Sequence, residues 1–171
     1  LKDEKTINGL LTGSVNCIKE NAYECMEETK RIFGKTDKRQ GYHLIISFEE
    51  NECDGNTAMK VIEDFVREYL ESDYEAVYAV HTNTDHVHGH IIWNSVRFTD
   101  GYKYHYKKGD WEKDIQPRID RICEKYNLST LEKSIEKTDK KEWDVLKNGP
   151  FVWNEQIKKD IDACVLRAVD Y

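Results

Sequence analysis

The stretch HTNTDHVHGHIIWNSV at residues 81–96 contains four of the six histidines of the chain. His86, His88 and His90 are spaced two residues apart, and alternate residues of a β-strand point to the same face of a sheet. Two isoleucines and a tryptophan follow at residues 91–93, and these are typical strand formers. The spacing therefore predicts a strand that presents the imidazoles of His88 and His90 side by side.

A second strand is predicted at residues 75–82, and it carries His81 near its end. The sequence NTD at residues 83–85 suits a turn, so the two strands are predicted to form a hairpin. Three neutral imidazoles, from His81, His88 and His90, would then converge as a divalent metal site with open coordination positions. The alternative is the weak, adventitious metal binding of a histidine-rich tract. The apolar strand residues between the histidines favour a specific site.

The composition predicts one soluble, globular domain. The chain has 171 residues, of which 35% are charged and 39% hydrophobic. No apolar run approaches the roughly 20 residues of a membrane span, and no signal peptide is recognisable. The five cysteines are odd in number and form no CxxC pair, so reduced thiols and a cytoplasmic location are expected. The chain begins at Leu1 without Met and is expected to be truncated at its N-terminus.

The net charge of −7 argues against a general nucleic-acid binder but leaves room for local basic patches. One patch contains Lys30, Arg31, Lys35, Lys38 and Arg39. The other contains Arg97, Lys103, Lys107 and Lys108, interleaved with Tyr102, Tyr104 and Tyr106. Aromatic rings among lysines suit single-stranded nucleic acid, through stacking and charge, whereas the alternative is a solvated hairpin surface. The predicted DNA-binding residues are Arg97, Lys103, Tyr104, Lys107 and Lys108.

Hydrophobic periodicity predicts the remaining elements. Helices are predicted at residues 19–33, 58–70, 109–126 and 150–169, and strands at residues 41–48, 87–98 and 102–106. Gly34 is a plausible stop for the first helix, Thr57 a plausible cap for the second, and Pro117 fits the first turn of the third. The second helix is predicted to bury Val61, Ile62, Phe65, Val66 and Tyr69.

These elements predict an α+β fold. The strands at residues 75–82, 87–98 and 102–106 are expected to form an antiparallel meander, with a turn at Asp100-Gly101 before the last strand. Helices packed on one face of the sheet would leave the other face for the three-histidine metal site. Residues 129–149 are rich in lysine and glutamate, and we expect them to be a mobile connection to the last helix.

The pattern H-x-N-x-D-H-x-H-x-H-I-I-x-N-S-V at residues 81–96 resembles the histidine motif of plasmid and transposon mobilisation relaxases, in the MobP-like branch of the HUH endonuclease class. Other segments are similar to the nuclease domain of that family: DEKT at 3–6, GYH at 41–43, SF at 47–48, DGYKYH at 100–105 and WNEQIKKDID at 153–162. The resemblance covers nearly the whole chain, so residues 1–171 are expected to form one relaxase domain.

The resemblance implies an enzyme that nicks one DNA strand at an origin of transfer and stays attached to the 5′ phosphate through a tyrosine. It implies His81, His88 and His90 as metal ligands on an antiparallel sheet. The implied partners are single-stranded or hairpin DNA at the origin and accessory relaxosome proteins. Imidazole ligands suit Mn, Ni, Co or Zn, and Mg is plausible where it is abundant. A divalent ion on neutral ligands keeps its full charge to polarise the scissile phosphate.

Three residues of the stretch have open roles. Relaxases of this type often have Asp at the position of Asn83, and Asn accepts a hydrogen bond but holds no charge. Asp85 is near enough in sequence to compensate. His86 is an additional imidazole that would orient a neighbour, contact DNA or serve the structure.

The nucleophile is the largest departure from the resembling proteins. Their catalytic tyrosine lies just N-terminal to the segment that matches residues 3–6, so it is expected upstream of Leu1. Residues 1–171 are therefore expected to bind metal and origin DNA and to nick poorly.

Three alternatives use the same histidines differently. A rolling-circle replication initiator or transposase of the same class carries its tyrosine on a helix after the histidines, where Tyr126 is predicted. A metal-dependent hydrolase of a small substrate would need a carboxylate base such as Asp85. A DNA-binding module without activity would use the histidines as a structural metal site.

Overall fold

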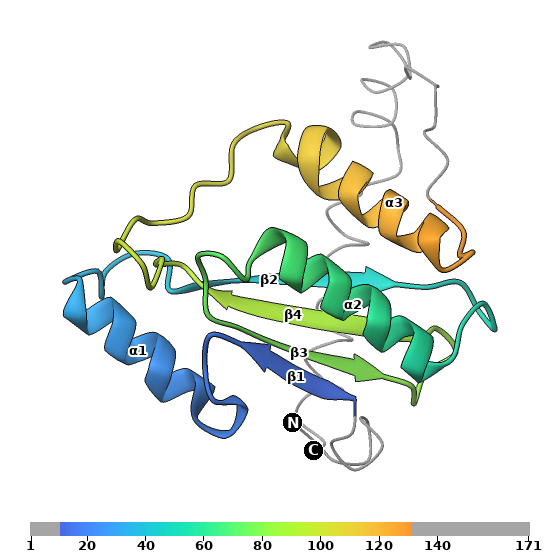
Figure 1. The fold of residues 1–171 in the computed structure, drawn as a ribbon, viewed down its shortest axis with the longest axis horizontal. Helices are drawn as coiled ribbons and strands as arrows, with labels where there is room; N and C mark the ends of the chain where they lie inside the picture. Colours follow the sequence, from blue (N-terminus) through green and yellow to red (C-terminus); the bar gives the residue numbers. More distant parts are fainter. Residues whose placement is uncertain (1–10, 131–171) are drawn as a thin grey trace, which may run out of the picture. The chain divides into compact units, whose positions relative to one another are not determined.

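The computed structural model describes residues 11–130, and this part of the chain has the predicted α+β fold. Its four strands form one antiparallel sheet in the order β1-β3-β4-β2 (Figure 1). The strands are β1 (Thr12–Val15), β2 (Gly41–Ser47), β3 (Ala76–His81) and β4 (His88–Asn94). The helices are α1 (Ala22–Ile32), α2 (Gly55–Tyr69) and α3 (Gln116–Lys125), with a 3₁₀ turn at Lys19–Asn21 before α1 and a π-helical turn at Trp111–Ile115 before α3.

Some predicted segments lie outside the described residues. They are the family-like segments at residues 3–6 and 153–162, the helix at residues 150–169, and the connection at residues 129–149 apart from its first two residues. Within residues 11–130, none of the helices is long and apolar enough to cross a membrane.

The sheet has two different faces because side chains alternate along each strand. On β4, Gly89, Ile91 and Trp93 are buried toward α2, whereas His88 and His90 point to the other side. We call this other side the histidine face, and the strand register places on it Thr12, Ser14, His43, Ile45, Ser47, Val77, Ala79, His81, His88, His90 and Ile92. On the opposite face, α2 packs on β3 and β4, and α3 packs against α2 (Figure 1).

Helix α2 supplies the centre of the core. Val61, Ile62, Phe65 and Val66 are fully buried, which confirms the apolar face predicted for this helix. Burying each of these side chains contributes on the order of 1.5–3 kcal/mol. Gly89 lets α2 approach β4, because a Cβ at this position would lie only 2.4 Å from Ile62 Cδ1. The helix is thus held against the strand that carries two of the histidines.

The ends of the helices agree with the sequence in two cases and differ in one. Gly34 follows α1 with a φ of +62°, a conformation that glycine adopts easily, and Pro117 lies in the first turn of α3. The cap of α2 is Asp54 rather than Thr57. The carboxylate of Asp54 accepts a hydrogen bond from the Thr57 backbone N–H at 2.7 Å, so the helix begins three residues earlier than predicted.

The prediction of a strand at residues 102–106 is wrong, and the sheet instead contains β1, which was not predicted. The turn at residues 100–101 is present, but the chain after it forms one isolated bridge, between Val96 and Lys103. A strand has two edges, and β3 and β2 occupy those of β4 along its whole length. The backbone of residues 102–106 is therefore hydrogen-bonded to the chain beyond the end of β4 and not to β4 itself, and the predicted meander stops after its first two strands.

Helix α1 is attached to the sheet by buried polar contacts at the far end of β4 from His88. Asn94 is fully buried, and its side-chain amide donates to the backbone oxygen of Met26 at 3.1 Å and to the carboxylate of Glu75 at 2.7 Å. Buried amides and carboxylates stabilise a fold when they are paired in this way. This end of β4 is consequently structural, and the His88 end is left for chemistry.

Candidate metal centre

Strands β3 and β4 bring three imidazoles together at one end of the histidine face. The register pairs His81 directly with His88, and it pairs His90 with Ala79 on the same face. Ring nitrogens from His81, His88 and His90 all lie within 4.8 Å of one another. The three side chains are half-buried, so a cation and a substrate can both reach them. The predicted ligand set is therefore assembled, and it can hold a divalent metal ion.

The backbone of the β3–β4 turn selects the nitrogen that His88 offers. Nδ1 of His88 lies 3.0 Å from the carbonyl oxygen of His86, and only a protonated Nδ1 can donate to it. The lone pair of this neutral ring is then on Nε2, free for a metal. Metal-binding histidines are commonly held in this way by a carbonyl on their other nitrogen. The residues present thus fit a metal site in chemistry as well as in position.

The other residues of the turn lie around the ligands without belonging to the cluster. His86 donates from Nδ1 to the carbonyl oxygen of Phe48 at 3.1 Å, which attaches the turn to the chain just after β2. The hydroxyl of Thr84 donates to the carbonyl oxygen of His86 at 2.7 Å. Asn83 and Asp85 are exposed. His86 therefore has a clear structural contact.

His43 was not predicted as a site residue, although the segment at residues 41–43 is similar to the relaxase nuclease domain. His43 is on β2, and its Nε2 lies 2.8 Å from Nδ1 of His90. The two rings are nearly parallel, with their centroids 5.1 Å apart. His43 could have been found from its spacing: it lies two residues before Ile45 and four before Ser47 in a predicted strand, so the three side chains share one face of the sheet.

Three of the five predicted DNA-binding residues are engaged in internal contacts. Arg97 donates to the hydroxyl of Tyr74 at 3.2 Å and lies 3.7 Å from the carboxylates of both Asp73 and Asp100. Lys103 donates to the backbone oxygen of Asp37 and also pairs with its carboxylate. The hydroxyl of Tyr104 is hydrogen-bonded to that of Tyr69, and its ring packs against Tyr42, Tyr74 and Trp93.

The other two, Lys107 and Lys108, are exposed, and so are the neighbouring Tyr106 and His105. They lie between the isolated bridge at Lys103 and the π-helical turn before α3. The structure therefore separates the predicted patch into an internal part and an accessible part.

Six tyrosines of residues 11–130 belong to the core on the helix-covered side of the sheet or pack against it: Tyr42, Tyr69, Tyr74, Tyr78, Tyr104 and Tyr126. Burial raises the pKa of Tyr69, Tyr74, Tyr78, Tyr104 and Tyr126 above the usual value, which disfavours the phenolate that a nucleophile needs. Tyr126, the candidate for a replication initiator, donates a hydrogen bond to the carboxylate of Asp64 at 2.9 Å.

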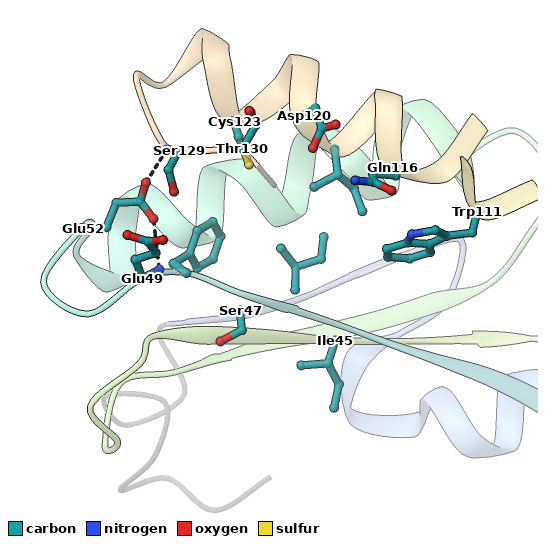
Figure 2. Close-up of a pocket in the computed structure, with 13 residues that line it drawn as sticks. Ile45, Ser47, Glu49, Glu52, Trp111, Gln116, Asp120, Cys123, Ser129 and Thr130 are labelled. Atoms are coloured by element: carbon teal, nitrogen blue, oxygen red, sulfur yellow. Dashed lines mark hydrogen bonds between the residues drawn. The ribbon is translucent and has the colours of Figure 1, made fainter. Parts of the chain in front are cut away.

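A cavity of about 170 Å³ lies between β2 and α3 (Figure 2). Its lining combines Ile46, Phe48 and Ile119 with the acidic side chains of Glu49, Glu52 and Asp120. Figure 2 shows Ile45 and Ser47 pointing away from α3, toward the histidine face. The carboxylates around this cavity repel phosphate, so it is a poor place for a nucleic acid.

Comparisons with known proteins agree with this geometry. The family model "Relaxase: MobA/VirD2-like, nuclease domain" matches residues 1–128. The chain is 31% identical over 150 residues to protein rlx of Staphylococcus aureus, which covers 87% of this chain and 45% of that protein. It is 30% identical over 110 residues to the group II intron-interrupted relaxase LtrB of Lactococcus lactis subsp. cremoris, covering 55% of this chain and 19% of that protein.

The chain spans less than half of the length of these curated relatives. No solved structure matches it significantly. The family model covers three quarters of the chain, including the whole histidine hairpin, and this confirms the resemblance noted in the sequence. The chain belongs to the relaxases, through a MobA/VirD2-like nuclease domain.

Proposed function

We propose that this domain nicks one strand of DNA at an origin of transfer and so initiates mobilisation of a plasmid or transposon. The observation that carries the proposal is the cluster of His81, His88 and His90 in a chain of the relaxase family. A divalent cation bound by these three imidazoles would polarise the scissile phosphate and stabilise the charge that builds on its oxygens. Mn, Mg, Ni, Co and Zn are all compatible with this ligand set.

The residues of this chain would orient the metal ligands and bind the DNA backbone. The carbonyl oxygen of His86 fixes the tautomer of His88, and the half-buried ligands leave the histidine face accessible to one DNA strand. Lys107 and Lys108 are exposed and can contact backbone phosphates. We do not assign this role to Arg97, Lys103 or Tyr104, because their polar groups already have partners within the domain.

The nucleophile that we propose is a tyrosine outside residues 11–130, and on the strength of the family resemblance we expect it upstream of Leu1. Its oxygen forms a bond to the scissile phosphorus, the bond from phosphorus to the 3′ oxygen breaks, and the phenolic proton leaves. The products are a free 3′ hydroxyl and a 5′ phosphotyrosine. The buried tyrosines described above are unsuited to this step because their pKa values are raised.

The test uses the full-length gene product and labelled single-stranded DNA from the transfer origin of its own element, with Mn²⁺. We expect a covalent protein–DNA adduct that survives denaturant, and both EDTA and His88→Ala should abolish it. Peptide mapping should place the DNA on a tyrosine outside residues 11–130. An adduct at Tyr126 would instead favour a replication initiator, and absence of any adduct with well-folded protein would contradict the proposal.

A further inference from the structure

His43 and His90 form a hydrogen-bonded pair that joins β2 to the metal-binding hairpin. In the register, His43 faces Ile92 and His90 faces Ile45, so the two histidines are diagonal neighbours on the histidine face. The distance of 2.8 Å between His43 Nε2 and His90 Nδ1 is that of a good hydrogen bond. β2 is paired with β4 along all seven of its residues, so the register keeps these two side chains next to each other.

The pair can be arranged in two ways when both rings are neutral, because one nitrogen of the contact must donate and the other accept. If His43 Nε2 carried the hydrogen, the proton of His90 would be on Nε2, and His90 would have no free lone pair for a metal. If His90 Nδ1 carries the hydrogen, His43 accepts it and the lone pair of His90 is on Nε2. Only the second arrangement is compatible with the ligand cluster.

We propose that His43 is the positioning residue of His90: it accepts the hydrogen on Nδ1 and thereby directs Nε2 of His90 to the metal. The inference rests on the proposed metal site. It goes beyond that site because it gives a role to His43, which is not one of the three ligands. His90 and His88 then share one arrangement, with a hydrogen-bond acceptor at Nδ1 and the ring lone pair on Nε2. In His88 the acceptor is a backbone carbonyl, and in His90 it is a side chain that mutation can remove.

A neutral imidazole is a suitable acceptor for this site. It orients His90 without adding negative charge beside the cation, so the charge of the cation remains available for an anionic phosphodiester. His43 is exposed, and its replacement leaves the buried core intact. Its effect can therefore be measured without loss of the fold.

The test is cobalt binding by the whole 171-residue chain, measured by calorimetry and by the visible absorption of Co²⁺. His43→Ala should weaken Co²⁺ binding about 10- to 100-fold, the usual loss for a partner of a ligand histidine. The spectrum at saturation should stay the same, because all three ligands remain. His43→Gln should restore most of the affinity, since the amide oxygen can accept the same hydrogen. Melting without metal should be equal for all variants.

Two further variants separate the possible failures. His105→Ala removes an exposed histidine that packs on Tyr102, and it should bind Co²⁺ as the parent does. His88→Ala should lose binding. If His88→Ala loses binding while His43→Ala matches the parent, the role of His43 is wrong and the metal site stands. If neither changes the affinity, the metal site itself is wrong. A changed spectrum in His43→Ala without rescue by Gln would make His43 a fourth ligand and overturn the proposal.

Discussion

At the scale of single residues, the nitrogen that His88 offers to a metal depends on an atom outside the ligand cluster. The carbonyl oxygen of His86 holds Nδ1 of His88, and the ring of His86 in turn holds the carbonyl oxygen of Phe48. From the sequence, three roles were open for His86, namely orienting a neighbour, contacting DNA and serving the structure. Its contacts match the first and the third of these roles. The His86 ring attaches the turn to the chain just after β2, and the His86 carbonyl oxygen accepts the hydrogen bond that orients His88.

His86→Ala is expected to weaken metal binding about tenfold, because the turn loses its contact with Phe48 and the acceptor for His88 becomes mobile. Titration calorimetry with Mn²⁺ or Co²⁺ measures the change. Asp85→Ala alters the neighbouring exposed position and is the matched control, with affinity expected to equal that of the parent. A larger loss in Asp85→Ala than in His86→Ala would show that a carboxylate in the turn, rather than its geometry, supports the site.

At the scale of elements, the sequence predicted those parts whose signals are local. The hairpin of His81 and His88, the apolar face of α2 and the turn at residues 100–101 follow from alternation, helical periodicity and turn chemistry. β1 was missed because its four residues, TGSV, carry little strand signal. Its Gly13 is explained by a distant partner, since a Cβ there would lie 2.4 Å from Tyr78 Cζ.

The order of the strands was also hidden from the sequence. Residues 102–106 have strand-like composition, yet β2 occupies the edge of β4 that they were predicted to take. The same long-range pairing explains why His43 was missed, because 47 residues separate it from His90. The ligands themselves could be predicted because they are neighbours in the chain as well as in space.

Gly89→Ala is expected to destabilise the domain by about 1–3 kcal/mol, the usual cost of an extra carbon in a packed core. The new Cβ would collide with Ile62, at 2.4 Å from its Cδ1 in the present arrangement. Urea denaturation measures the free energy of unfolding. Ile62→Ala removes both colliding carbons, Cδ1 and the Cγ1 that would lie 2.5 Å from the new Cβ, so Gly89→Ala should cost less in that background. Equal costs in both backgrounds would mean that α2 does not press on β4 at this point.

The cap of α2 predicts a pH dependence. The hydrogen bond from the Thr57 backbone lowers the pKa of Asp54 below its ordinary value of 3.8. A carboxylate with a lowered folded-state pKa stabilises fully above its unfolded-state pKa, and this stabilisation is lost as the pH falls through the folded-state pKa. Asp54→Asn keeps an oxygen acceptor but has no charge.

We therefore expect the parent to be more stable than Asp54→Asn at neutral pH, and the difference to shrink as the pH falls below 3.8. Denaturation curves of both proteins across this range measure it. A difference that does not vary with pH would show that the charge of Asp54 contributes nothing to the cap.

At the scale of the whole molecule, an acidic chain is proposed to bind an acidic polymer. The net charge is −7, and the cavity between β2 and α3 carries carboxylates. DNA binding in such a protein depends on where the positive groups lie rather than on their total. In our proposal, the positive charges that attract the DNA phosphates are those of the exposed Lys107 and Lys108 and of a cation bound by the three histidines.

Lys107→Ala with Lys108→Ala is expected to weaken binding of single-stranded DNA and to reduce its salt dependence. Each lost phosphate contact lowers the slope of log affinity against log salt by about 0.7 for a single strand. Fluorescence anisotropy between low and moderate salt measures both quantities. Lys125→Ala is the matched control, because Lys125 on α3 is paired with Asp64 at 2.7 Å. A slope unchanged in the double variant would remove these lysines from the DNA-binding surface.

The alternation along β4 has a consequence for how this domain can evolve. Gly89 and Ile91 are constrained by the fit of α2, whereas His88 and His90 lie on the other face, outside the buried core. Substitutions at His88 and His90, one at a time, are therefore expected to leave the buried core in place, so that the chemistry of this face can change while the fold is kept.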